Sequence, residues 1–443
     1  MKLTLDERIW GLSLIWKEAE YNFPFWKHLG DLDWDRAYKE ALPKIIAADT
    51  IREYYLELCR FISLLRDGHT AVWFPKELYM EAGQLPMRIG LIGTKWCIVN
   101  SDISLNIPLY DEIVTINGIP ITEYIAKSIY PYCWHEKEDS ALREVNTLLP
   151  IVEYRKELTL QTLSGLYRIK AMDRDINWKQ NINMKSKESL TKIFSSKTHT
   201  ISITDDNIAV ISIPTFMEDD LGREFYDNMP KIKNCKGYII DIRNNSGGNS
   251  DNADCVVQAF IDGEFTYSTD REMVHIGSYK AWGMYHELDS IDQSNEWSKK
   301  LYDICKRQYF VYGTDKKKIN ECPFTLTAPL VVLENEGTAS AAEDMLICLD
   351  AVGRATIVGT PSCGSTGQPL VFDLPGGGEG RICTRWCTYP DGKEFINIGV
   401  IPHIYAVPSF EELRNGYDSV LDGGINVLRT EQKRTLWEEK TGL

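Results

Sequence analysis

The stretch that most constrains the fold is an apolar, β-branched run at residues 330–333, which breaks at Asn335 and passes into a helical pattern reaching Leu349. Ser340 stands among small residues at the first turn of this predicted helix. A strand, a tight turn and a helix hold a hydroxyl on rigid elements, and the N–H groups at a helix N-terminus favour an oxyanion. The simpler interpretation is that Ser340 only caps the helix, because serine is a common N-cap residue. The rest of the chain decides between the two.

The second half of the chain alternates between strand and helix patterns. The predicted strands cover residues 208–213, 237–242, 330–333 and 355–359. The second of them runs into Gly247-Gly248, and the carboxyl ends of such strands meet at one edge of the sheet, where ligands usually bind. Glycine allows a backbone N–H to approach a substrate closely. We therefore expect the N–H groups of Gly247 or Gly248, and that of Ala341 beside Ser340, to form an oxyanion hole.

Residues 1–75 are predicted to be helical. Capping boxes at Thr4–Glu7 and Thr50–Glu53 mark two helix starts, and Gly68 ends the second helix. His69 follows in a loop, where a neutral imidazole is available as a base at pH 7. A single histidine is more often structural or solvated than catalytic, so His69 gains weight only from the other features of the chain.

Residues 83–173 are rich in strand patterns and contain a hairpin-type turn at Asn117-Gly118. A helical insertion is predicted inside this module at residues 130–152. The polar, Lys- and Ser-rich segment 177–197 is the predicted linker. The two remaining predicted parts are the α/β core, residues 198–408, and a C-terminal helical tail, residues 409–443.

Composition excludes several classes of protein. A net charge of −15 argues against nucleic acid or an anionic membrane as the main partner, and no apolar run is long enough to span a bilayer. The eleven cysteines are scattered without a CxxC pair, so we expect no zinc site, no disulfide framework and a reducing compartment. We expect no other metal and no cofactor. Asp6 and Glu7 interrupt any apolar stretch of a signal peptide. We therefore expect a cytoplasmic protein, unless an export signal precedes residue 1, and we leave a homo-oligomer open.

Several segments carry a family resemblance in their order along the chain. They read LRDGHTAVWFP, DEIVTINGIPI, GYIIDIRNNSGGN, NEGTASAAEDM, VGTPSCGSTGQPLVFDLPGGG and NIGVIPHI. Together they resemble the C-terminal processing (tail-specific) peptidases and the related tricorn-core serine proteases. The resemblance implies an α/β fold with a ClpP/crotonase-like core, an N-terminal helical region and an inserted PDZ-like β-rich module.

The same resemblance implies that Ser340 is the catalytic serine. The bacterial branch of the family uses a lysine downstream of the serine as base, and Ser365 stands at that position here. The tricorn branch uses a histidine after the N-terminal helices, which His69 matches, but two of the groups that orient it there are replaced in this chain. The candidates left for orienting His69 are Asp67, Ser365 and Glu394.

The sequence thus predicts a serine-type peptidase that cleaves peptides or unfolded polypeptides near the C-terminus, with Ser340 as nucleophile and His69 as base. A non-catalytic protein that binds peptides or apolar ligands on the same scaffold is the alternative, since a fold does not fix a function. A hydrolase of small acyl substrates is a third possibility. A fluorophosphonate probe distinguishes them, because it reports an activated serine without knowledge of the substrate.

Overall fold

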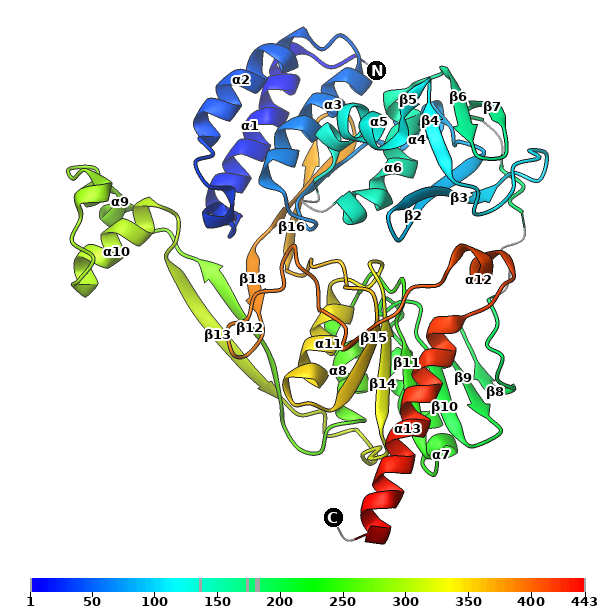
Figure 1. Ribbon diagram of the computed structural model, residues 1–443. Helices are drawn as coiled ribbons and strands as arrows, with labels where there is room; N and C mark the ends of the chain where they lie inside the picture. The colour runs from blue at the N-terminus through cyan, green and yellow to red at the C-terminus, as the bar shows by residue number, and fades with distance from the viewer. Residues whose placement is uncertain (1, 135–137, 173–174, 180–183, 442–443) are drawn as a thin grey trace.

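The computed structural model describes residues 2–134, 138–172, 175–179 and 184–441. Figure 1 shows an α/β core, a helical region and a small β-rich module on one side of it, and a ribbon of strands that projects away from the body. Both capping boxes expected from the sequence are present, with Thr4 and Thr50 as N-caps. The N-terminal helices are α1 (Leu5–Asn22), η1 (Trp26–Leu29), α2 (Trp34–Ala47), α3 (Ile51–Ile62) and η2 (Ser63–Leu65).

A seven-stranded sheet forms the centre of the core. Strands β10, β11, β14, β15 and β19 run parallel, and β9 and β8 continue the sheet in antiparallel pairing. The central strands are buried on both faces, which explains why their sequences are continuously apolar. In sheet order the strands are β19 (Ile404–Tyr405), β15 (Ala355–Gly359), β14 (Leu330–Glu334), β11 (Gly237–Asp241), β10 (Ile208–Ser212), β9 (Thr200–Thr204) and β8 (Leu190–Ser195).

Helices cover both faces of this sheet (Figure 1). Side chains alternate along a strand, so Leu330 and Val332 of β14 pack in the main core, whereas Val331 and Leu333 pack against Ile425 of α13. Part of the predicted C-terminal tail therefore covers the core, through Val420, Leu421, Ile425 and Leu428 of α13. The helices around the sheet are α7 (Leu221–Ile232), α8 (Ser250–Gln258), α11 (Ala341–Ala351), α12 (Phe410–Arg414) and α13 (Ser419–Thr441).

Two small sheets connect the core to the rest of the molecule. In the first, β1 pairs with β17 so that Ala71 lies opposite Arg381. This pairing positions the loop before β1, which contains His69, next to the core. In the second, β12 and β13 form the projecting ribbon, with α9 and α10 at its tip (Figure 1). Their elements are β1 (Ala71–Trp73), β16 (Pro369–Leu374), β17 (Gly378–Cys383), β12 (Phe265–Met273), β13 (Phe310–Lys317), β18 (Arg385–Thr388), α9 (Gly277–Gly283), η4 (Leu288–Ser290) and α10 (Glu296–Cys305).

The β-rich module contains a two-stranded and a four-stranded sheet. The predicted turn at Asn117-Gly118 is confirmed: it joins β4 to β5, and both residues have positive φ, as a tight hairpin requires. The predicted insertion contains η3 and α6, while its residues 135–137 lie outside the described part. The module's elements are α4 (Lys76–Ala82), β2 (Met87–Ile92), β3 (Lys95–Ser101), β4 (Ile113–Ile116), β5 (Ile119–Pro120), α5 (Ile121–Ser128), η3 (Tyr130–Tyr132), α6 (Glu138–Val152), β6 (Glu157–Thr162) and β7 (Leu166–Lys170).

The predicted linker at residues 177–197 is corrected by the structure. Its second half contains β8, which pairs with β9 as the edge strand of the central sheet. Most side chains of β8 are exposed or half-buried. An edge strand of this kind tolerates polar and charged residues, so its composition resembles that of a linker.

Two absences concern only the described residues. None of their helices combines the length and the apolar character that crossing a membrane requires. No three or more His, Cys, Asp or Glu side chains in that part of the chain are grouped so as to hold a metal ion.

Candidate active site

Ser340 lies between β14 and α11, at the carboxyl edge of the central sheet. Its φ is 57°, a left-handed conformation that a residue with a side chain rarely adopts. Such strain persists only where the surroundings fix it, and it is common at functional sites. Here the Ser340 N–H donates to the carbonyl of Ser365 at 2.9 Å and also lies 3.2 Å from Oε2 of Glu343. The serine is thus the N-cap of α11, as the simpler interpretation held, but in a constrained geometry.

His69 reaches Ser340 from the far end of the sequence. Its Nε2 lies 3.3 Å from Oγ of Ser340, although the two residues are 271 positions apart. The loop between η2 and β1 carries the imidazole, and the ring is largely buried, with a relative exposure of 8%. A separation of 3.3 Å is close to hydrogen-bonding distance, and such bonds are often long in proteins without substrate. The nucleophile and base predicted from the sequence are therefore adjacent in the structure.

Among the three candidates for orienting His69, Ser365 contacts the imidazole: its Oγ lies 2.6 Å from Nδ1. Asp67 accepts a hydrogen bond from the backbone N–H of His69 at 3.1 Å and another from a neighbouring hydroxyl, and these contacts shape the loop. Glu394 binds elsewhere, because its two oxygens accept from an arginine on β12 and an indole on β18. The structure thus places the imidazole of His69 between two hydroxyls, with Ser340 at Nε2 and Ser365 at Nδ1.

Glu343 is the residue at this site that the sequence analysis did not single out. Its carboxylate is completely buried and accepts from the N–H of Gly364 at 2.6 Å, the N–H of Ser365 at 2.9 Å and the hydroxyl of Ser362 at 2.5 Å. With the contact to Ser340, one carboxylate connects the nucleophile turn to the loop that holds Ser365. Burial raises the pKa of Glu343 to about 7, although the hydrogen bonds lower it.

The next residue, Asp344, is also buried and points elsewhere. Its carboxylate lies 3.3 Å from the hydroxyl of Thr366, and burial together with the charge of Glu343 raises its pKa. A sequence signal for Glu343 existed: Ser340 and a glutamate three residues later form the S-x-x-E pattern of a capping box. That pattern predicts a contact with the cap N–H but not with the distant loop.

Gly247 lies against the nucleophile, and Gly248 lies against the backbone of Phe216 and Met217. A Cβ on Gly247 would lie 2.6 Å from Cβ of Ser340, so only glycine fits there. The N–H of Gly247 donates to Oδ1 of Asn245 at 2.9 Å, and this hydrogen bond leaves it poorly placed for an oxyanion. Among the described residues, none accepts a hydrogen bond from the N–H of Gly248 or of Ala341. These two are the better candidates of the predicted set.

Comparisons with known proteins find peptidases among the proteins that this chain resembles. Residues 207–406 match the model of peptidase family S41. The chain is 28% identical over 240 residues to the carboxy-terminal-processing protease of Bartonella bacilliformis, covering 50% of this chain and 46% of that protein. It is 25% identical over 213 residues to the carboxy-terminal processing protease CtpA of Bacillus subtilis, covering 47% and 37%. The chain thus matches less than half the length of these curated relatives.

Solved structures extend the likeness of fold over nearly the whole chain. Mature CPAF complexed with lactacystin superposes with a TM-score of 0.68 at 17% identity, covering 98% of both chains. A putative peptidase from Parabacteroides merdae gives a TM-score of 0.54 at 14% identity, covering 96% and 97%. The resemblance to the C-terminal processing peptidases is confirmed, since residues 207–406 match the model of peptidase family S41 and both curated relatives are carboxy-terminal processing proteases.

Proposed function

We propose that this protein is a serine peptidase that hydrolyses peptide bonds in peptides or unfolded polypeptides, cutting near the C-terminus. The observation that carries the proposal is the position of His69, with Nε2 at 3.3 Å from Oγ of Ser340 and Nδ1 at 2.6 Å from Oγ of Ser365. A base must accept a proton at Nε2, so the productive tautomer carries its proton on Nδ1 and donates it to Ser365.

The reaction follows from this tautomer. Ser340 Oγ attacks the scissile carbonyl while His69 Nε2 takes its proton, and the oxyanion is held by the N–H groups of Gly248 and Ala341. His69 then gives the proton to the departing amine, which leaves an ester on Ser340. Water loses a proton to His69, attacks the ester, and the proton returns to Ser340 as the second product leaves.

Glu343 supports this chemistry without touching a substrate. It fixes the backbone of Ser365 and of Ser340 at once, so the three catalytic atoms are positioned before substrate binds. We regard it as a positioning residue.

A non-catalytic binding protein on the same scaffold is the second candidate. The observation in its favour is the hydroxyl of Ser365 at Nδ1, because a neutral hydroxyl stabilises an imidazolium ion less than a carboxylate does. Labelling with a fluorophosphonate separates the two candidates. A peptidase gives a covalent adduct on Ser340, which His69→Ala prevents and Ser365→Ala slows. Absence of an adduct on the folded wild-type protein would contradict the peptidase proposal.

The β-rich module, which resembles a PDZ domain in sequence, was expected either to recruit the substrate or to stabilise the core. The outward N–H and C=O of Ile89 in β2 are bound by the side-chain amide of Asn146 in α6, each at 2.8 Å. A peptide that added to β2 at this point would have to displace Asn146. We therefore propose a stabilising role for the module in the conformation described.

A further inference from the structure

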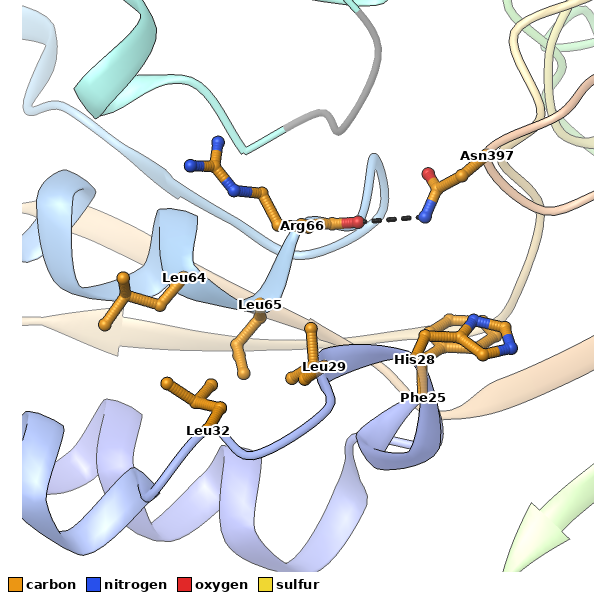
Figure 2. Close-up of a pocket in the computed structure, with 8 residues that line it drawn as sticks. All are labelled: Phe25, His28, Leu29, Leu32, Leu64, Leu65, Arg66 and Asn397. Atoms are coloured by element: carbon orange, nitrogen blue, oxygen red, sulfur yellow. Dashed lines mark hydrogen bonds between the residues drawn. The ribbon is translucent and has the colours of Figure 1, made fainter.

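Asn397 connects two loops of the candidate active site that are far apart in the sequence. Its side-chain amide donates to the backbone carbonyl of Arg66 at 3.1 Å, and Figure 2 shows the two groups facing each other. Its backbone N–H donates to the carbonyl of Gly364 at 2.7 Å. Arg66 lies three residues before His69, and Gly364 lies directly before Ser365. One residue therefore holds both the loop of the proposed base and the loop of the hydroxyl that contacts it.

The turn that contains Asn397 fits closely against the Ser365 loop. A Cβ on Gly364 would lie 2.7 Å from the backbone nitrogen of Gly399 and 3.0 Å from that of Asn397, so the two segments leave no room between them. Directly after the turn, the N–H of Val400 donates to the hydroxyl of Ser362 at 2.7 Å. The turn and the Ser365 loop are therefore packed as one unit.

The segment between Arg66 and His69 is also constrained. The N–H of Thr70 donates to the carbonyl of Asp67 at 3.1 Å, which closes a tight turn around His69. The carboxylate of Asp67 accepts from the N–H of His69 at 3.1 Å. A shift of the Arg66 carbonyl is therefore passed on to the imidazole instead of being absorbed by the chain between them.

Both residues of this hydrogen bond have a left-handed backbone, with φ of 49° at Arg66 and 59° at Asn397. Ser340 shares this conformation, with φ of 57°. Residues other than glycine rarely adopt it, and it persists only where the surroundings fix it. Asparagine tolerates it better than most residues and also carries an amide donor. Asn397 meets both requirements of its position.

We propose that Asn397 is a positioning residue, which sets the contact between Nδ1 of His69 and Oγ of Ser365 by fixing the Arg66 carbonyl relative to Gly364. This role rests on the proposed peptidase function. A neutral hydroxyl holds an imidazole by one hydrogen bond, without the added attraction of an opposite charge. The distance of Ser365 from the ring therefore depends on how the two loops are held, and Asn397 holds both.

The test uses Asn397→Gly in the full chain, which keeps the left-handed backbone and its N–H and removes only the amide. Fluorophosphonate labelling of Ser340 should slow by about 10²-fold, since misplacing a catalytic group by about 1 Å costs that much. With a fluorogenic peptide, kcat should fall while KM stays within a few-fold, because the role concerns the base and not substrate binding. Asn397→Asp keeps the shape but cannot donate to the Arg66 carbonyl, so its labelling should also slow.

Asn207 offers a matched control. It too has a left-handed backbone, with φ of 71°, and its side-chain amide donates to the carbonyl of Asn234 at 2.8 Å. It precedes β10, whereas Ser340 follows β14, so the two residues lie at opposite edges of the parallel strands. Asn207→Gly removes an equivalent hydrogen bond and should leave labelling and kcat within a few-fold of wild type.

A spectroscopic measurement reads the contact itself. In protein with ¹⁵N-labelled histidine, the Nδ1–H proton of His69 that Ser365 holds should give a signal that His69→Ala removes and that Asn397→Gly weakens or abolishes. Absence of this signal from the wild type, or its persistence in Asn397→Gly, overturns the proposal. So does a slowing of labelling in both glycine variants in proportion to their melting temperatures, because that is the result of a merely structural role.

Labelling of the wild type separates this role from the function. Wild-type protein that is not labelled contradicts the peptidase proposal itself. Labelled wild-type protein with an unchanged rate in Asn397→Gly overturns the role of Asn397 alone. Slow labelling together with the loss of the Nδ1–H signal, in Asn397→Gly and not in Asn207→Gly, supports it.

Discussion

The nucleophile loop of the core and the β2 edge of the module use the same device with opposite results. In each, a polar side chain from a helix binds backbone groups that the sheets leave unpaired. Glu343 of α11 accepts from the N–H groups of Ser340 and Ser365, and Asn146 of α6 binds both the N–H and the C=O of Ile89. The first arrangement holds a strained serine against an imidazole, whereas the second closes a strand edge.

The difference lies in what the fixed backbone presents. Satisfying buried polar groups is required in any fold, because an unmade hydrogen bond costs about 1–3 kcal/mol. Around Ser340 this requirement also orders groups that can react, since the fixed loop carries the hydroxyl of Ser365 to Nδ1 of His69. At Ile89 it removes the only groups with which an added strand would pair at that residue. The same kind of hydrogen bond from side chain to backbone therefore orders a candidate active site around Ser340 and blocks strand addition at Ile89.

The largest effect is expected from a substitution that removes the nucleophile and leaves the hydrogen bonds of Glu343 and Asn146 intact. Ser340→Ala should abolish peptide hydrolysis, with a loss of about 10⁴-fold or more in kcat, because no other group supplies the covalent step. The hydroxyl of Ser340 makes its hydrogen bond with His69, so the melting temperature should change little. Hydrolysis of a fluorogenic peptide and thermal unfolding measure the two. Activity within a few-fold of wild type would remove Ser340 from the mechanism.

The next largest effect is expected from a substitution that disrupts the hydrogen bonds of Glu343 in the core. Glu343→Gln keeps the shape but turns an NH₂ group toward some of the N–H and O–H donors, so the loop at Ser365 should lose its position. We expect a fall of about 10²–10³-fold in the rate of labelling at Ser340, together with a lower melting temperature. Asp344→Asn is the matched control, since it alters a buried carboxylate that contacts Thr366 instead. Equal losses of labelling in both variants would reduce Glu343 to a general stability role.

The pH dependence tests whether the carboxylate form of Glu343 is needed. Burial raises the pKa of Glu343 to about 7, so lowering the pH below 7 protonates it in the folded protein, and a carboxylic acid has fewer sites to accept four donors. Activity should therefore fall as the pH drops through about 7. Glu343→Gln has no carboxylate to protonate at this position, so the ratio of wild-type to variant kcat/KM should decrease over the same range. A ratio that does not change with pH would show that the carboxylate form of Glu343 is not needed.

The smallest effect on catalysis comes from the module. Asn146→Ala removes both hydrogen bonds to Ile89, which should lower stability by about 1–3 kcal/mol and speed hydrogen exchange at β2. Labelling of Ser340 should stay within a few-fold of wild type, because the core network is untouched. The exposed neighbour Thr147, changed to alanine, is the control for the helix itself. A loss of labelling as large as that of Glu343→Gln would show that the two regions are coupled.

Part of the secondary structure could be predicted from the sequence, because short stretches of sequence specify it. Apolar runs specified the parallel strands, the capping boxes at Thr4 and Thr50 specified helix starts, and Asn117-Gly118 specified a two-residue hairpin. The polar composition of β8 led to the wrong assignment of a linker, because an exposed edge strand and a linker have similar side chains.

The sequence by itself determined which residue types stand at strand ends and helix starts, and so it predicted Ser340 and the glycine pair as reactive groups. The family resemblance added His69 as the base. Tertiary structure alone decided which of the candidates Ser365, Asp67 and Glu394 contacts the imidazole of His69, because the sequence does not distinguish among them. It also decided that Glu343 joins two loops and that the N–H of Gly247 is already bound to Asn245. The physical reason is that hydrogen bonds depend on distances of about 3 Å between atoms, and these distances arise only when segments far apart in the chain pack together.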